Sequence, residues 1–323
     1  MFAVWLKLPR GATVTGERLL RVRICGGSTL LLLSSALTYP CVTARLSRPR
    51  LLHSVTPVRS TMAKLSPQAE LHPDQFTLVI PCYNEEKRLN PSEIARLSRE
   101  DGLTVLLVDD GSSDGTAALA EGLVSQSNGK IDFLQLEQNG GKAEAVRRGL
   151  LRALDNGANC VGFLDADLST PVDEMLRLVQ YMRERPAITV VLASRIRLLG
   201  NDVQRKPHRH YLGRLFATAA SLTLDLDIYD TQCGAKLFRN GPALRSALGR
   251  PFTSRWIFDV ELIGRLIYGA PAEHALTAEQ FAEVPLRTWR DVAGSKLRPQ
   301  HMFRAIGELA QLQHQFKQMR AHH

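Results

Sequence analysis

Short apolar segments alternate with longer amphipathic segments between residues 76 and 193 of the chain. The apolar segments are rich in Val, Ile and Leu, which is typical of β-strands. We expect strands at residues 76–81, 104–108, 131–136, 160–165 and 188–193. The intervening segments predict helices at about 92–100, 116–124, 143–155 and 171–185, the first of them capped by Ser92. Strands alternating with helices predict a mostly parallel sheet covered by helices on both faces.

The pattern is less regular after residue 195. We expect a helix at about 211–224, a turn at 230–234, a strand at 235–238, a helix at 256–268, an edge strand at 284–289 and a final helix at about 301–319. On the final helix, one stripe is formed by Phe303, Ile306, Leu309 and Phe316. Such a stripe can dock on a membrane surface, but core packing is its more common use, and we expect packing. The predicted fold class is α/β, with residues 62–323 as a single domain.

The formal net charge of +9 is concentrated in the first residues of the chain. Residues 1–61 contain nine Lys or Arg and one acidic residue, which leaves about +1 for the rest. This near-neutral body argues against a nucleic-acid-binding module. The five cysteines are odd in number and lack a CxxC spacing, which argues against a disulfide framework or a zinc site and suits a reducing compartment.

Residues 24–42 include a short apolar segment that follows Arg21 and Arg23 and resembles the apolar part of a signal peptide. The segment is shorter than the roughly 20 apolar residues of a membrane span. An acid-poor leader rich in Arg and Ser also suits a transit peptide. A further interpretation is that translation begins at Met62, just ahead of the first strand, and we favour that or disorder for residues 1–61. We expect a cytoplasmic body with peripheral contact to a membrane surface, and the targeting role of the leader stays open.

Two acidic residues, Asp165 and Asp167, follow the apolar segment at 160–165. In open α/β sheets, ligands bind beyond the carboxyl ends of the strands. Two neighbouring carboxylates there can share an oxygen-preferring divalent cation and leave its other positions for water and phosphate. The alternative is a strand-to-helix turn in which Asp167 or Ser169 caps the next helix.

Polar residues also follow the first two predicted strands, at 83–85 and at Asp109–Asp110. A carboxylate after the second strand suits a nucleoside, because it can accept from a ribose hydroxyl or a base N–H. The dinucleotide-binding GxGxxG is missing after the first strand, which argues against a dehydrogenase. Lys142 follows a glycine pair at a predicted helix N-terminus, where contact with phosphate and simple solvation are equally good interpretations.

Eight blocks of the sequence together resemble glycosyltransferase family 2, and the later blocks resemble its dolichyl-phosphate glucosyltransferase branch. The blocks are IPCYNE at 80–85, VDDGSSDGT at 108–116, NGGK at 139–142, DAD at 165–167, SR at 194–195, DTQCGAKLF at 230–238, RWIFDVEL at 255–262 and GSKL at 294–297. The resemblance implies a nucleotide-sugar-binding fold of the GT-A type and an inverting transfer from UDP-glucose. It divides the domain into a donor half at about 76–195, an acceptor half at about 196–300 and the final helix.

The resemblance also assigns roles to individual residues. Uridine would be held by Pro81, Tyr83, Glu85 and Asp110. Asp165 and Asp167 would hold Mg²⁺ or Mn²⁺ on the diphosphate, with Lys142 near the phosphates. Arg195 and Arg209 would bind an acceptor phosphate, since charge-assisted and often bidentate contacts are what Arg provides. Lys296 lies in a Gly-containing loop that would close over the diphosphate.

The type of acceptor decides whether a general base is needed. A lipid phosphate is already anionic, whereas a sugar hydroxyl needs a carboxylate within hydrogen-bond reach. Asp259 is the candidate base and Asp230 the second, although Asp259 and Glu261 also suit helix-surface charge or an ion pair with Arg255. We expect a polyprenyl-phosphate acceptor. The alternatives are a hydroxyl acceptor on a glycolipid or glycan, a mannosyl donor, and a nucleotide-sugar-binding protein without turnover.

Overall fold

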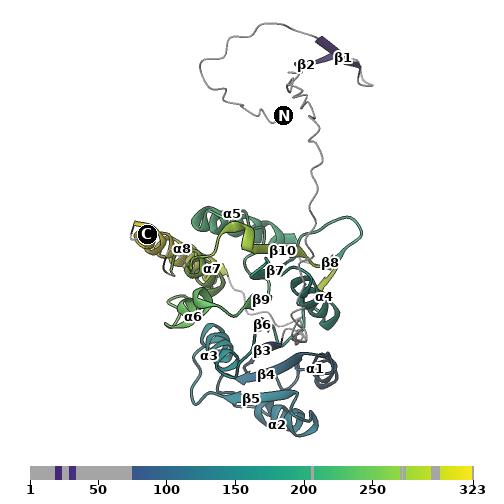
Figure 1. Ribbon diagram of the computed structural model, residues 1–323, viewed down its shortest axis with the longest axis vertical. Coiled ribbons are helices and arrows are strands. Elements are labelled where there is room, and N and C mark those ends of the chain that lie inside the picture. The colour runs from purple at the N-terminus through teal and green to yellow at the C-terminus, as the bar shows by residue number, and fades with distance from the viewer. Residues whose placement is uncertain are drawn as a thin grey trace, which may run out of the picture. The chain divides into compact units, whose positions relative to one another are not determined.

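A seven-stranded sheet forms the centre of residues 69–323 in the computed structural model (Figure 1). The structure describes residues 19–23, 29–33, 75–204, 207–269, 271, 274–291 and 299–321, with backbone only for 19–23, 29–33, 207–212, 299–304 and 321. Residues 1–68 form a separate unit, in which β1 (Leu19–Arg23) pairs antiparallel with β2 (Thr29–Leu33).

The strands of the central sheet follow the order β10-β7-β9-β6-β3-β4-β5. Their bounds are β3 Phe76–Cys82, β4 Leu103–Asp109, β5 Ile131–Gln135, β6 Cys160–Leu164, β7 Val190–Ser194, β9 Ala235–Arg239 and β10 Phe281–Pro285. All pairs are parallel except those of β9, which lies antiparallel between β6 and β7. The predicted α/β class with a mostly parallel sheet is therefore confirmed.

Helices cover both faces of the sheet (Figure 1). One face carries α1 (Pro91–Ser98), α2 (Thr116–Gln126) and α4 (Val172–Arg183). The other carries α3 (Lys142–Asp155), α5 (Pro207–Leu224), α6 (Pro242–Leu248), α7 (Phe258–Tyr268) and α8 (Pro299–Ala321). The remaining elements are the short helix η1 (Ala278–Gln280) and a separate parallel pair, β8 (Asp202–Gln204) with β11 (Thr288–Arg290).

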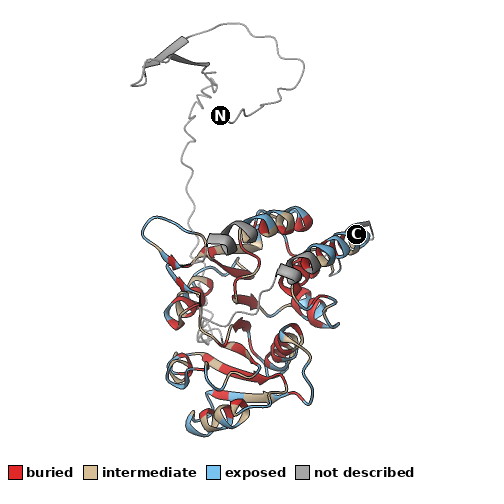
Figure 2. Cartoon of the chain, turned by 180° about the vertical axis from the view of Figure 1, so that it is seen from behind, coloured by how far each residue is buried: buried red, intermediate tan, exposed pale blue. Residues whose placement is uncertain are grey.

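Alternation along each strand divides the core into two clusters. On β3, Phe76 and Leu78 pack with α1 and α4, whereas Val79 packs with α3 on the opposite face. Gly149 lets α3 approach closely, because an added Cβ would meet the side chains of Val79 and Val108. Figure 2 shows the result, with buried strands and exposed outer helix surfaces.

Several local predictions were wrong. Asn90, not Ser92, caps α1, and its side chain accepts from the backbone N–H groups of Ser92 and Glu93. The predicted edge strand at 284–289 is two strands, β10 and β11, which belong to different sheets. Asp167 and Ser169 do not cap α4, whose N-cap is Pro171.

The final helix packs on the core, as its stripe predicted. Leu309 and Phe316 are buried, while Ile306 is exposed. Gly264 on α7 leaves the space that the Phe316 ring fills. None of the described helices combines the length and the apolar composition that crossing a bilayer requires.

Candidate active site

Three predicted site segments meet at one edge of the sheet. β6, β3 and β4 are adjacent and parallel, so the residues that follow them lie at the same end. The N–H of Asp165 donates to the carbonyl of Gly234 at 2.9 Å, which brings the start of β9 to this edge as well. The pairing of β3 with β6 ends at Val79, before Pro81. The missing N–H of Pro81 therefore interrupts no backbone hydrogen bond between these two strands.

Asp110 organises the glycine-bearing loop before α3. Its Oδ1 accepts from the Gly140 N–H and its Oδ2 from the Gly141 N–H, both at 2.8 Å. The side chain of Asn139 donates to the Asp110 carbonyl at 3.0 Å. Burial raises the pKa of Asp110, and the two backbone donors oppose that rise. This carboxylate fixes the backbone immediately before Lys142.

Lys142 and Asp165 form an ion pair with 2.5 Å between Nζ and Oδ1. Burial lowers the pKa of Lys142, but attraction from Asp165 and then from Asp259 outweighs it, so the pKa is raised. Asp167 uses its Oδ1 to accept from the Ser169 N–H at 3.0 Å, directly after Leu168, whose φ is +50°. Both predicted cation ligands therefore lie in a tight turn beyond β6.

The donor set beside Asp165 fits an oxygen-preferring cation. Within the described part of the chain, the buried Oδ1 of Asp165 makes no hydrogen bond of regular geometry, although Lys142 faces it. Gly234 lies against this carboxylate so closely that a Cβ there would overlap it. Asp165 and Asp167 are the residues that would hold Mg²⁺ or Mn²⁺.

Asp259 is buried in an ion pair that the sequence did not predict. Its Oδ1 accepts from Lys236 Nζ at 2.5 Å, and Gln232 Nε2 lies 3.5 Å from its Oδ2. Lys236 is fully buried, donates also to the Cys233 carbonyl at 2.6 Å, and lies 5.1 Å from the centre of the Phe163 ring. The sequence carries one sign of this ion pair, namely a lysine inside the apolar Ala-Lys-Leu-Phe strand. A fully buried lysine requires a partner.

Arg195 forms a bidentate ion pair with Asp230. Nε donates to Oδ2 at 2.6 Å and Nη2 donates to Oδ1 at 2.8 Å. The guanidinium also lies 5.4 Å from the centre of the Trp289 ring. Burial lowers the pKa of Arg195, but the attraction and hydrogen bonds of Asp230, together with the attraction of Cys233 and Asp165, outweigh it and raise the pKa overall. The two ion pairs engage both candidate bases, Asp259 and Asp230.

Among the predicted uridine residues, Pro81 lies in β3, Tyr83 and Glu85 follow β3, and Asp110 follows β4. Tyr83 is 40% exposed, and Glu85 accepts from Arg88 at 2.5 Å while its N–H donates to Thr116 Oγ1 at 2.8 Å. Lys296 lies outside the described residues, and so does the side chain of Arg209. The structure therefore brings Pro81, Tyr83, Glu85, Asp110, Lys142, Asp165, Asp167 and Asp259 to one end of the sheet or onto the elements that border it.

Two residues near the site have structural roles. Glu261 pairs with Arg265 at 2.6 Å, not with Arg255, and accepts from the backbone N–H groups of Thr253 and Ser254. Burial raises the pKa of the Cys233 thiol to about 11, which agrees with a packing role. Both residues are buried, and their contacts hold the structure around them.

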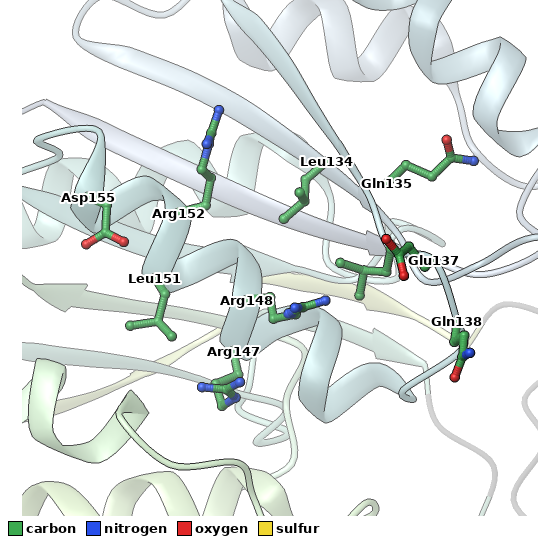
Figure 3. A pocket seen from close by; sticks show the side chains of 10 residues that line it. Leu134, Gln135, Glu137, Gln138, Arg147, Arg148, Leu151, Arg152 and Asp155 are labelled. Carbon is green, nitrogen blue, oxygen red and sulfur yellow. The ribbon is translucent and has the colours of Figure 1, made fainter.

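A hollow of about 730 Å³ lies between the end of β5 and α3 (Figure 3). Arg147, Arg148 and Arg152 line it together with Glu137 and Asp155. None of the predicted site residues is in its lining. We therefore centre the candidate site on the strand ends and not on this hollow.

Comparison with known proteins gives one family. The family model described as Glycosyl transferase family 2 matches residues 77–244. A dolichyl-phosphate beta-glucosyltransferase of Drosophila melanogaster is 33% identical over 275 residues, covering 76% of this chain and 75% of its own. A protein of the same name from Trichomonas vaginalis is 30% identical, covering 73% and 70%. Polyprenol monophosphomannose synthase of Mycolicibacterium smegmatis is 27% identical, covering 75% and 89%.

Solved structures share the fold. Glucosyl-3-phosphoglycerate synthase from Mycobacterium tuberculosis, in complex with Mn²⁺, UDP-glucose and phosphoglyceric acid, aligns with a TM-score of 0.54 and 22% identity. The alignment covers 74% of this chain and 80% of the synthase chain. The same synthase in complex with UDP gives a TM-score of 0.54 at 20% identity, with the same coverage. At this level of identity the likeness shows the fold alone.

Proposed function

Because the chain belongs to glycosyl transferase family 2, we propose that it transfers glucose from UDP-glucose to a polyprenyl phosphate such as dolichyl phosphate. Family membership makes it a glycosyltransferase of the hexosyltransferase kind with a GT-A-type fold. The names of several relatives near 30% identity support the finer assignment of donor and acceptor. We further propose that the transfer inverts the anomeric carbon.

The ion pairs made by the two candidate bases favour a phosphate acceptor over a hydroxyl acceptor. Asp259 is paired with buried Lys236, and Asp230 is paired with Arg195 through both of its oxygens. A hydroxyl acceptor must lose a proton to a nearby base as it attacks. An anionic phosphate oxygen attacks without losing one. An acceptor that brings its own negative charge therefore suits this site better.

The donor half supplies the groups that hold the nucleotide sugar. In our proposal Pro81, Tyr83, Glu85 and Asp110 form the uridine pocket, because they lie at the ends of the adjacent strands β3 and β4. A divalent cation on Asp165 and Asp167 would supply charge neutralisation for the departing diphosphate. The proposed lysine contacts to the same phosphates are Lys142 and Lys296, which follows β11 in the sequence.

The acceptor phosphate approaches from the side of Arg195. Two of the five N–H groups of this guanidinium bind Asp230, which leaves the others to contact a phosphate. The ion pair and Trp289 hold the guanidinium in one orientation, so little side-chain entropy is lost when the acceptor binds. Arg209 is the second proposed contact. One phosphate oxygen then bonds to the anomeric carbon as the bond from that carbon to UDP breaks.

Exposed apolar side chains near the acceptor half support a lipid acceptor. Four leucines are exposed on the turn after β7 and on α5, namely Leu198, Leu199, Leu215 and Leu222. Residues 195–214 contain six Lys or Arg and one acidic residue. Exposed leucines among basic residues suit peripheral contact with an anionic bilayer. The turn and α5 both lie at the top of the domain in Figures 1 and 2.

A mannosyl donor is a second candidate, because the polyprenol monophosphomannose synthase of M. smegmatis covers 75% of this chain. A hydroxyl acceptor on a glycolipid or glycan is a further alternative within the family.

A donor and acceptor panel tests the proposal. The full chain is incubated with Mn²⁺, each of several UDP- and GDP-sugars, and either polyprenyl phosphate or sugar acceptors, and the products are weighed by mass spectrometry. We expect glucosyl polyprenyl phosphate from UDP-glucose, and its loss in Arg195→Ala. If the chain instead transfers the sugar to a hydroxyl acceptor, and Asp259→Asn abolishes that transfer, the hydroxyl alternative would be established. Binding of UDP-glucose without transfer or hydrolysis would identify a non-catalytic binder.

A further inference from the structure

We propose that Lys142 is an internal counter-cation of Asp165 that a divalent metal ion must displace. The inference rests on the proposed function for the identity of the metal site. In the described structure the Lys142 ammonium is 2.5 Å from Oδ1 of Asp165, one of the two residues that would hold the metal. Repulsion between two positive charges a few ångströms apart opposes simultaneous contact of a lysine and a divalent cation with this carboxylate.

The side chain of Lys142 is able to leave. It is 42% exposed and carries a flexible four-carbon stem, whereas the carboxylate of Asp165 is 31% exposed and its backbone is fixed by the bond to Gly234. The backbone of Lys142 is itself held, because Asp110 accepts from both preceding N–H groups. Displacement of the ammonium therefore requires only side-chain rotation.

The donor provides the place to which the ammonium moves. A nucleotide diphosphate bound beside the proposed metal offers Lys142 a second anion, so displacement then costs little. Without nucleotide, the lysine loses its contact with Asp165 and gains no phosphate in exchange. Metal binding should therefore be opposed in the free protein and favoured once UDP is present. Nucleotide and metal would bind cooperatively through this one side chain.

Manganese binding in the absence of acceptor tests the inference. Free Mn²⁺ is measured by electron paramagnetic resonance during titration of the full chain, with and without UDP. The variants are Lys142→Met, Lys142→Arg, Asp165→Asn to remove a proposed metal ligand and, as a control, Lys130→Met at an exposed lysine before β5. Circular dichroism confirms that each variant is folded. Without UDP, we expect Lys142→Met to bind Mn²⁺ about five- to tenfold tighter than the natural chain. A partly exposed ion pair of this kind stabilises by up to about 1 kcal/mol, and the repulsion between the lysine and the metal ion adds to the cost that Lys142 imposes on metal binding.

Lys142→Arg and Lys130→Met are expected to match the natural chain, and saturating UDP should shrink the advantage of Lys142→Met. Equal Mn²⁺ affinity in the natural chain and Lys142→Met would overturn the inference, even if the enzyme transfers glucose. An unchanged affinity in Asp165→Asn would overturn the metal site itself, and so would no Mn²⁺ binding with UDP present. Tighter binding by Lys142→Met in a chain that transfers no sugar would sustain the inference while the proposed function fails.

Discussion

The buried ion pair between Lys236 and Asp259 gives the sharpest stability prediction. Lys236→Met leaves the Asp259 carboxylate in the core with Gln232 at 3.5 Å and the attraction of Lys142, and it removes the donor to the Cys233 carbonyl. Removing one partner of a buried pair costs about 3–5 kcal/mol, because the other charge stays buried without compensation. We expect a loss of that size in the free energy of unfolding.

Urea denaturation measures the loss, from the midpoint and the slope of the unfolding curve. The double variant Lys236→Met with Asp259→Leu removes both charges and should lose clearly less than the sum of the two single variants. Arg96→Ala is the matched control, because Arg96 pairs with Asp173 on the solvent-exposed surface and its loss should leave the unfolding curve almost unchanged. A Lys236→Met variant within about 1 kcal/mol of the natural chain, or strictly additive losses, would refute the reasoning.

Three further predictions concern single positions. Gly234→Ala places a Cβ on the Asp165 carboxylate, so we expect the rate of glucose transfer to fall about tenfold or more. The control is Gly122→Ala, where the new methyl group meets nothing within 4 Å and the rate should stay unchanged. Asn90→Ala removes the cap of α1 and should cost about 1 kcal/mol in urea unfolding, and no loss would contradict the assigned cap. The hydrogen bond from Arg147 lowers the pKa of Glu144, so its contribution to stability is present above the unfolded pKa and is lost as pH falls through the lowered folded value. Glu144→Gln should therefore flatten the acid side of the stability curve, and an unchanged curve between about pH 3 and 6 would contradict this.

The strands and the meeting of their acidic ends could be predicted from the sequence. Continuous apolar runs rich in Val, Ile and Leu indicate the strands, and parallel pairing then places Asp110 and Asp165 at the same end of the sheet whatever the exact strand order. The Asn90 cap also has a sequence signal, because Pro91 follows it at the first helical position, whereas the prediction named Ser92.

Long-range pairings could not be predicted in the same way. The antiparallel insertion of β9 between β6 and β7 joins residues that are far apart in sequence, and no local pattern specifies it. The partner of Lys236 depends on that insertion, since Asp259 comes from α7. The split of 284–289 likewise depends on β8, a three-residue strand with almost no sequence signal. The local pattern thus predicted the acids of the site, but not which lysine or arginine side chain pairs with each of them.

Cation-dependent turnover tests the central claim most directly. Glucose transfer from UDP-glucose to polyprenyl phosphate is measured for the full chain with Mn²⁺, after chelator treatment, and for the double variant Asp165→Asn with Asp167→Asn. Asp173→Asn, at an exposed acid on α4, is the control. We expect the chelated protein and the double variant to lose about 100-fold or more in rate, since a metal stabilises the transition state by several kcal/mol. Full turnover in either would contradict the assignment of these two carboxylates as the cation site.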